Sequence, residues 1–182
     1  MEKSNDLSKL KELILLISKS AEESHFFGAT HLNKILYFAD FYHFKYTGKS
    51  ITDAEYFKLE HGPAPKDLVR ARQELIDEGR LDIKPREIAG GWIQKRPIVK
   101  KGVDEKKFTE FQRDLVSQAV NMACSYAAGQ ISEISHKHLS WKLAELEETI
   151  PYFTIHATRV NEITGSSKKW AEELATATAL VK

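Results

Sequence analysis

The chain has 182 residues, of which 42% are hydrophobic and 29% are charged, and its formal net charge is +1. This composition is typical of one globular domain with at most a small appendage, and it excludes a disordered chain. The near-zero charge gives no overall field that would attract nucleic acid or an anionic membrane. No apolar run approaches the roughly 20 residues of a membrane span, and residues 1–6 do not resemble a signal peptide, so we expect a cytoplasmic protein without a membrane partner.

Apolar periodicity predicts a first helix over residues 4–20 and a second helix over residues 30–46. Ten of the 18 aromatic residues lie between Phe26 and Phe57, and most of them fall in the second helix. A helix that is apolar over most of its circumference needs partners on several sides, so we expect the second helix to be the centre of the core. Thr30 is its predicted N-cap and Gly48 its predicted end.

The next segment combines a short strand, a proline-rich turn and a hairpin. Alternation predicts a strand over residues 55–59, and the prolines of residues 61–65 predict a stiff extended stretch. Pro65 is expected in the first turn of a helix over residues 65–78, with Val69 and Ile76 among its core residues.

Further strands over residues 81–86 and 92–99 are joined around Gly90 and Gly91, which permit the positive φ of a tight hairpin. A long helix over residues 104–126 follows, with Asp104 as its predicted cap. The remaining predicted elements are helical pieces over 132–139 and 141–148, an irregular segment or brief strand over 151–157, and a helix over 168–181.

Together these elements predict an α+β fold that is mainly α: a helical bundle around a central aromatic-rich helix, with a small antiparallel β-sheet or hairpin. Residues 1–157 are expected to form the domain. Residues 158–182 are expected to form a C-terminal helical extension packed on the domain or extending from it.

No arrangement of residues indicates catalysis. His136 and His138 are two positions apart, so on a helix they point about 200° away from each other and cannot share a metal ion. The chain has neither the nucleophile elbow of serine hydrolases nor a phosphate-binding Walker loop. We therefore expect a protein that is not an enzyme, with no catalytic residue, metal ion or cofactor.

Nucleic-acid binding is the alternative hypothesis. Residues 84–107 hold eight basic and three acidic residues, a local charge of 8 − 3 = +5, and phosphate contacts need clustered cations of this kind. A helix followed by a basic hairpin resembles the helix and wing of winged-helix DNA-binding proteins, which would suit an operon autorepressor. Against this, the helix over 65–78 has balanced charge and makes a poor groove reader. The candidate DNA-contacting residues are Lys84, Arg86, Lys95, Arg96, Lys100 and Lys101.

Protein binding is favoured by the aromatic residues of the central helix. Tyr37, Phe41, Phe44 and Tyr46 cannot all face the same core as Ile35 and Leu36. Either other elements cover them, or they form an aromatic surface that anchors a partner.

Several short motifs are similar to those of one family. The stretches are KILYFAD at residues 34–40, GKSIT at 48–52, HGPAP at 61–65 and SHK at 135–137, together with Tyr56 and Trp141. Across roughly residues 7–151 they resemble the SocA-like, phage-associated antitoxin family, also called the Panacea domain.

The resemblance implies a cytoplasmic antitoxin of a bacterial or prophage toxin–antitoxin system, which neutralises a cognate toxin by direct binding. It also implies a Clp-type protease as a second partner if the antitoxin acts as a proteolytic adaptor, and it leaves a homodimer open. The toxin itself cannot be inferred, and its variable contacts are expected outside the motifs, including residues 168–181. Carried over by motif, the candidate partner-binding residues are Tyr37, Asp40, Tyr56, Gly62, Pro63, Pro65, His136 and Trp141.

Overall fold

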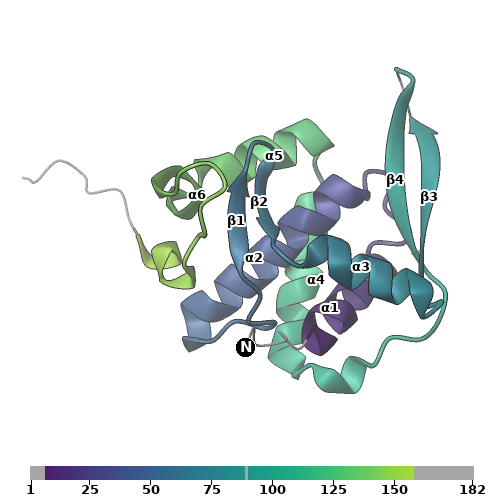
Figure 1. The fold of residues 1–182 in the computed structure, drawn as a ribbon, viewed down its shortest axis with the longest axis horizontal. Coiled ribbons are helices and arrows are strands. Elements are labelled where there is room, and N and C mark those ends of the chain that lie inside the picture. The colour runs from purple at the N-terminus through teal and green to yellow at the C-terminus, as the bar shows by residue number, and fades with distance from the viewer. Residues whose placement is uncertain (1–6, 89, 158–182) are drawn as a thin grey trace, which may run out of the picture.

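The helix α2 (Ala29–Thr47) runs through the middle of the molecule (Figure 1). The computed structural model describes residues 7–88 and 90–157. Within them α2 packs against α1 (Ser8–Ser20), α4 (Glu110–Cys124) and α5 (Ala128–Lys137). Eleven of its nineteen residues are buried, which confirms the prediction of an α+β, mainly helical fold around a central aromatic-rich helix.

The two ends of α2 differ in how well the sequence predicted them. Gly48 ends the helix in the left-handed conformation, with φ of 73°, and its N–H donates to the Phe44 carbonyl at 2.8 Å, as predicted. The predicted N-cap was wrong: the cap is Gly28, and Thr30 already lies inside the helix.

The strand β1 (Tyr56–Leu59) was predicted, whereas its partner β2 (Gly62–Pro65) was not. The two pair antiparallel, with Tyr56 opposite Pro65 and Lys58 opposite Pro63. The Tyr56 carbonyl and both backbone groups of Lys58 bond on the other side of β1, to residues 147–150. The missing proline N–H groups therefore remove no bond from the ladder. Two prolines therefore fit in this strand.

The helix α3 (Leu68–Asp77) begins later than predicted, because Pro65 ends β2 and does not start the helix. Its buried stripe consists of Leu68, Ala71 and Leu75. The prediction that Val69 and Ile76 face the core was wrong, since they are 70% and 36% exposed.

The hairpin of β3 (Leu81–Ile88) and β4 (Trp92–Val99) is confirmed, with Leu81 paired to Val99 and Ile88 to Trp92. Gly90 and Gly91 have φ of 86° and 75°, the positive values that the turn requires. The hairpin projects from the helical body (Figure 1).

The second half of the chain is helical with shorter elements than expected. A 3₁₀ turn η1 (Glu105–Lys107) precedes α4, whose cap is Thr109 in a capping box with Gln112, so the prediction of Asp104 as cap was wrong. The chain then forms α5, α6 (Leu139–Leu143) and a 3₁₀ turn η2 (Tyr152–His156), so both predicted helical pieces were placed too late in the sequence. The helix expected over residues 168–181 lies outside the described residues.

Candidate functional site

The carboxylate of Asp40 is the hub that joins α2 to the following loop and to β1. The side chain is fully buried. Its Oδ1 accepts the N–H groups of Ile51 and Thr52 at 2.8 and 2.9 Å, and its Oδ2 accepts the hydroxyl groups of Thr52 and, at 2.8 Å, Tyr56. Burial raises the pKa of Asp40, and these donors oppose the rise because they favour the charged form. Three of the family-like motifs thus meet at one side chain.

A second meeting point lies at the other half of α2, around Lys34. This side chain is only 2% exposed, its ammonium donates to the His61 carbonyl, and burial lowers its pKa to about 8. Gly62, the next residue, has φ of 103°, and a β-carbon there would lie 2.6 Å from Ser135 Oγ and 2.9 Å from Lys34 Cε. Two features therefore require glycine at position 62: the positive φ of its backbone and the lack of space for a β-carbon.

The aromatic residues of α2 are mostly covered by other elements. Tyr37 and Phe41 are buried, with ring centroids 4.3 Å apart, and both lie against Tyr56. Phe44 is half-buried and stacks on Tyr152 at 5.5 Å. Tyr46, in contrast, is 64% exposed, so the covered arrangement holds for three of the four predicted aromatic residues.

Trp141 and His136 form a partly exposed stack between α5 and α6. Their ring centroids are 4.1 Å apart at an interplanar angle of 15°. The ammonium of Lys58 lies 4.2 Å from the Trp141 ring centroid and donates to the Ala144 carbonyl, which ties β1 to α6. Burial, and then the charge of Lys34, lower the pKa of His136, so burial and a nearby cation both favour a neutral ring there.

Exposed leucines lie on the elements around this stack. Leu59, Leu143 and Leu146 are 41%, 64% and 61% exposed, and the Trp141 indole N–H donates to the Leu59 carbonyl at 3.4 Å. We use the name Trp141 surface for five exposed or partly exposed residues of β1, α5, α6 and the loop after α6, namely His136, Trp141, Leu59, Leu143 and Leu146. Leu143 lies two positions after Trp141 on α6, so the two side chains leave that short helix on different sides. Trp141 lends it an aromatic anchor of the type that concentrates binding energy in protein interfaces.

The eight predicted partner-binding residues fall into two groups. Six of them are buried and shape the fold around α2: Tyr37, Asp40, Tyr56, Gly62, Pro63 and Pro65. His136 and Trp141 are partly exposed and belong to the Trp141 surface. Direct contact of any of the eight with a partner stays a prediction.

The six predicted DNA-contacting residues lie on or just after the β3–β4 hairpin. Arg96 is held by the protein itself, because its guanidinium donates to the carbonyls of Ser24, at 2.8 Å, and of Glu22. Arg86 contacts the ring of His25 at 3.2 Å, and Lys100 lies 3.8 Å from Asp82. Lys84, Lys95 and Lys101 are exposed, and DNA binding by this hairpin stays a prediction.

His136 and His138 lie in different environments. His136 stacks on Trp141, whereas His138 packs edge-on against Phe38 and Tyr42. Among residues 7–88 and 90–157, no group of three His, Cys, Asp or Glu side chains could hold a metal ion, and no helix could cross a membrane.

Sequence reasoning missed two kinds of residue. Lys34 and Ser135 lie inside the motifs, yet helical periodicity gives no reason to expect a buried lysine beside a serine from another helix. The exposure of Leu143 and Leu146 could have been suspected from the sequence, because they are large apolar residues in a segment whose apolar residues do not form one helical face.

The fold and these contacts define a small helical domain that is organised by two buried side chains of its central helix α2. Lys34 bonds to the turn between β1 and β2, and Asp40 bonds to the loop after α2 and to β1. The family model described as "Antitoxin SocA-like, Panacea domain" matches residues 32–142, which include Lys34, Asp40 and Trp141. The chain therefore belongs to the SocA-like antitoxin family, which gives it a general antitoxin role. Comparison with curated proteins and with solved structures finds no match.

Proposed function

We propose that this protein neutralises a cognate toxin by binding it directly through the Trp141 surface. The observation that carries the proposal is the exposure of three leucines on β1, on α6 and directly after α6, namely Leu59, Leu143 and Leu146. These elements adjoin or hold His136 and Trp141, the two of the eight candidates that reach the surface. Apolar side chains around an aromatic anchor exclude water from an interface and so strengthen the contact at its centre.

The buried motif residues support this surface without touching the toxin. Lys58 fixes Trp141 from β1, and the β1–β2 turn is fixed in turn by Lys34 through the His61 carbonyl. A rigid, preformed surface loses little conformational entropy on binding, which favours affinity. No step of this mechanism requires catalysis, a cofactor or a metal ion.

Growth rescue tests the proposal. The product of the neighbouring gene is expressed alone and together with this protein, and we expect co-expression to restore growth. The double variant Leu143→Glu, Leu146→Glu is expected to lose rescue, because two carboxylates at an apolar interface must be desolvated. Val69→Glu is the matched control, since Val69 is 70% exposed on α3, outside the Trp141 surface. Rescue by the double variant as strong as by the wild type would reject this surface.

The half-life of the toxin in the cell distinguishes neutralisation by occlusive binding from delivery of the toxin to a protease. If the antitoxin acts by occlusion, the toxin accumulates in the complex and its half-life is unchanged or longer. If the antitoxin delivers the toxin to a Clp-type protease, the half-life shortens and lengthens again when the protease is removed. Both modes require the same direct contact.

A further inference from the structure

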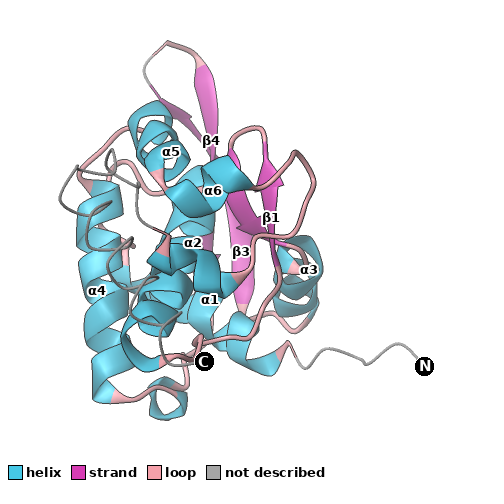
Figure 2. Cartoon of the chain, turned by 90° about the vertical axis from the view of Figure 1, so that its left-hand side faces the viewer, coloured by secondary structure: helices cyan, strands magenta, loops and turns pink. Residues whose placement is uncertain are grey.

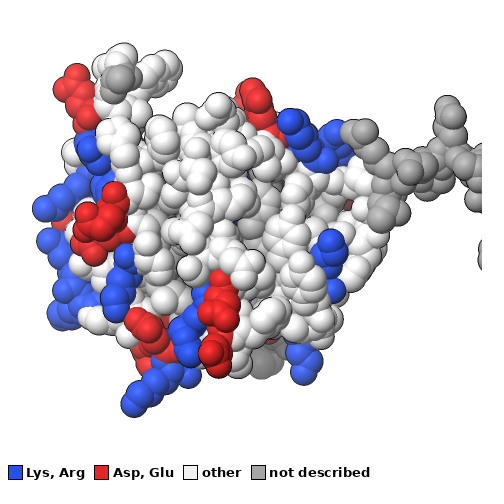
Figure 3. Space-filling view, turned by 180° about the vertical axis from the view of Figure 1, so that it is seen from behind, with Lys and Arg blue, Asp and Glu red and all other residues white. Residues whose placement is uncertain are grey.

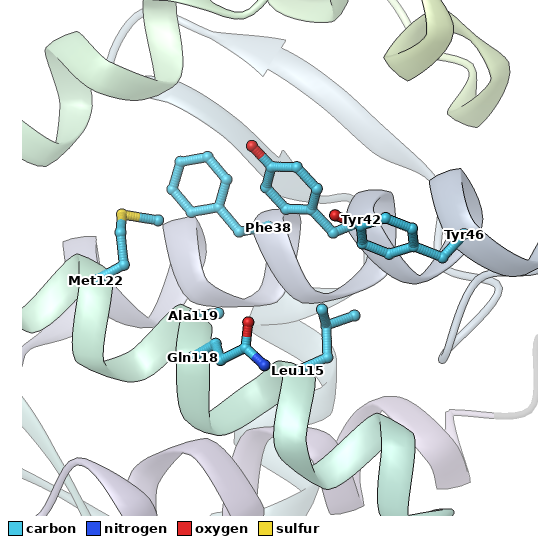
Figure 4. A pocket seen from close by; sticks show the side chains of 7 residues that line it. All are labelled: Phe38, Tyr42, Tyr46, Leu115, Gln118, Ala119 and Met122. Carbon is cyan, nitrogen blue, oxygen red and sulfur yellow. The ribbon is translucent and has the colours of Figure 1, made fainter.

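A groove is lined by residues of α2 and α4. The helix α4 lies on the opposite side of the molecule from α3 and β1 (Figure 2). The volume of the groove is about 240 Å³. Phe38 and Tyr42 from α2 line it together with Leu115 and Met122 from α4, and the rings of Phe38 and Tyr42 extend to the side of α2 away from α4 (Figure 4). The small side chain of Ala119 lies between Leu115 and Met122 along α4, so the hollow opens where a larger residue would fill the space.

The α4 side of the groove carries no charged residue from Leu115 onward, whereas on the α2 side the Lys45 ammonium lies 5.9 Å from the ring centroid of Tyr42. From residue 115 to residue 132 the sequence has no Lys, Arg, Asp or Glu, although Ser117, Gln118 and Asn121 are exposed. Figure 3 shows this side of the molecule, with charged side chains gathered toward its edges and an uncharged middle. Depletion of charged residues around an apolar centre is typical of a surface that is covered by another segment or protein.

The sequence beyond the described residues contains a segment that matches such a groove. Trp170, Leu174, Ala177 and Val181 are spaced by four, three and four residues, which places them on one face of a predicted helix. Glu172 falls on the opposite face. The predicted helix over residues 168–181 therefore presents one apolar stripe, headed by a tryptophan.

The chain reaches the groove easily from its last described residues. The turn η2 packs on α2, with the rings of Tyr152 and His156 5.5 and 6.1 Å from that of Phe44. Phe44 lies between Tyr42 and Tyr46, which line the groove on another side of the same helix. Residues 158–167 span up to about 33 Å when extended, whereas an α-helix is about 10–12 Å wide.

We infer that the α2–α4 groove seats the chain's own segment over residues 168–181, with Trp170 in the hollow above Ala119. A buried tryptophan removes about 150–250 Å² of surface from water, and here it would also shield the exposed ring of Tyr46. Attachment through a short linker gives the segment an effective concentration in the mM range, so it outcompetes a second copy at ordinary protein concentrations.

Isotope labelling of the methionine methyl groups tests, in the full-length protein, whether residues 168–181 occupy the α2–α4 groove. The chain has two methionines, Met1 and Met122, and Met122 lines the groove. In protein labelled with ¹³C at the methionine methyl groups, we expect a cross-relaxation signal between the Met122 methyl and the Trp170 indole. Trp170→Ala is expected to shift the Met122 resonance and leave that of Met1 in place. Glu172→Gln, on the opposite face of the predicted helix, is expected to shift neither.

Two outcomes would overturn the inference. The first is a Met122 resonance that does not move in Trp170→Ala, which would mean that this segment does not occupy the groove. The second is a contact that disappears on dilution, which would mean that a second copy of the chain occupies the groove. Because the measurement uses the free protein, its outcome is independent of whether a toxin binds the Trp141 surface.

Discussion

Gly62 and Ser135 pack so closely that a β-carbon on Gly62 would lie 2.6 Å from the Ser135 hydroxyl oxygen. The glycine also has φ of 103°, a backbone conformation that residues with a side chain rarely adopt. We expect Gly62→Ala to lower the free energy of unfolding by about 2–4 kcal/mol, from backbone strain and overpacking together. Denaturant unfolding measures this loss.

Gly91→Ala is the control for the strain alone. Gly91 has φ of 75°, and nothing lies within 4 Å of a β-carbon there, so we expect a smaller loss of about 1 kcal/mol. Equal losses in the two variants would show that the contact between Gly62 and Ser135 is not tight.

Removing the Tyr56 hydroxyl is expected to destabilise the protein through Asp40. The carboxylate would lose one of its four hydrogen bonds while remaining fully buried, and a bond to a charged group contributes about 1.5–3 kcal/mol. Tyr152→Phe is the matched control, because the Tyr152 hydroxyl donates to the neutral carbonyl of Ala54 at 2.6 Å. Thermal unfolding should give a larger decrease in Tm for Tyr56→Phe, and the reverse order would contradict the role of Asp40.

The pH dependence of stability reports on Lys34. Burial lowers the pKa of Lys34 from 10.5 to about 8, so between these values the unfolded chain binds a proton that the folded chain has released. The free energy of unfolding therefore rises with pH in this window, by up to about 1.4 kcal/mol per pH unit. Below pH 8 both states are protonated and the penalty for burying the charge is constant.

Lys34→Met isolates this effect, because it removes the titrating group and keeps a long apolar side chain. The free energy of unfolding of the wild type minus that of the variant should rise between pH 8 and pH 10.5. A difference that stays flat over that range would mean that the folded protein keeps the ammonium with an ordinary pKa, and one that falls would mean that folding raises the pKa of Lys34.

The elements that were predicted correctly from the sequence are those whose ends or turns depend on the conformational preference of a few neighbouring residues. Gly48 ends α2, and Gly90 and Gly91 turn the hairpin, because positive φ is a local property of glycine. Strand β2 was missed because Pro63 and Pro65 argue locally against a strand, and only the third segment at residues 147–150 explains why they are tolerated. The cap of α4 could have been found, since Thr109 and Gln112 have the spacing of a capping box.

The candidate site was less predictable than the fold. Motif resemblance picked out Asp40, Gly62 and Trp141, but only tertiary contacts separate the first two, which are buried, from Trp141, which reaches the surface. Burial of Lys34 depends on residues far away in the sequence, such as Ser135, and helical periodicity contains no information about it.

Variants of the β3–β4 hairpin can distinguish basic residues that stabilise the fold from basic residues that are free to contact DNA. Arg96 donates to two backbone carbonyls before α2, so we expect Arg96→Ala to lower Tm by several degrees. Lys95→Ala, one position earlier and exposed, is expected to leave Tm unchanged. Scanning fluorimetry measures both, and a stable Arg96→Ala protein would contradict the observed contacts. A gel shift with operator DNA is informative only for a variant that keeps its stability, such as Lys95→Ala.

Calorimetric titration of this protein with the purified product of the neighbouring gene tests the central claim most directly. We expect saturable binding by the wild type and by Val69→Glu with equal affinity. The double variant Leu143→Glu, Leu146→Glu should bind at least roughly tenfold more weakly, a loss of about 1.4 kcal/mol or more. No binding by the wild type, or unchanged affinity of the double variant, would contradict neutralisation through the Trp141 surface.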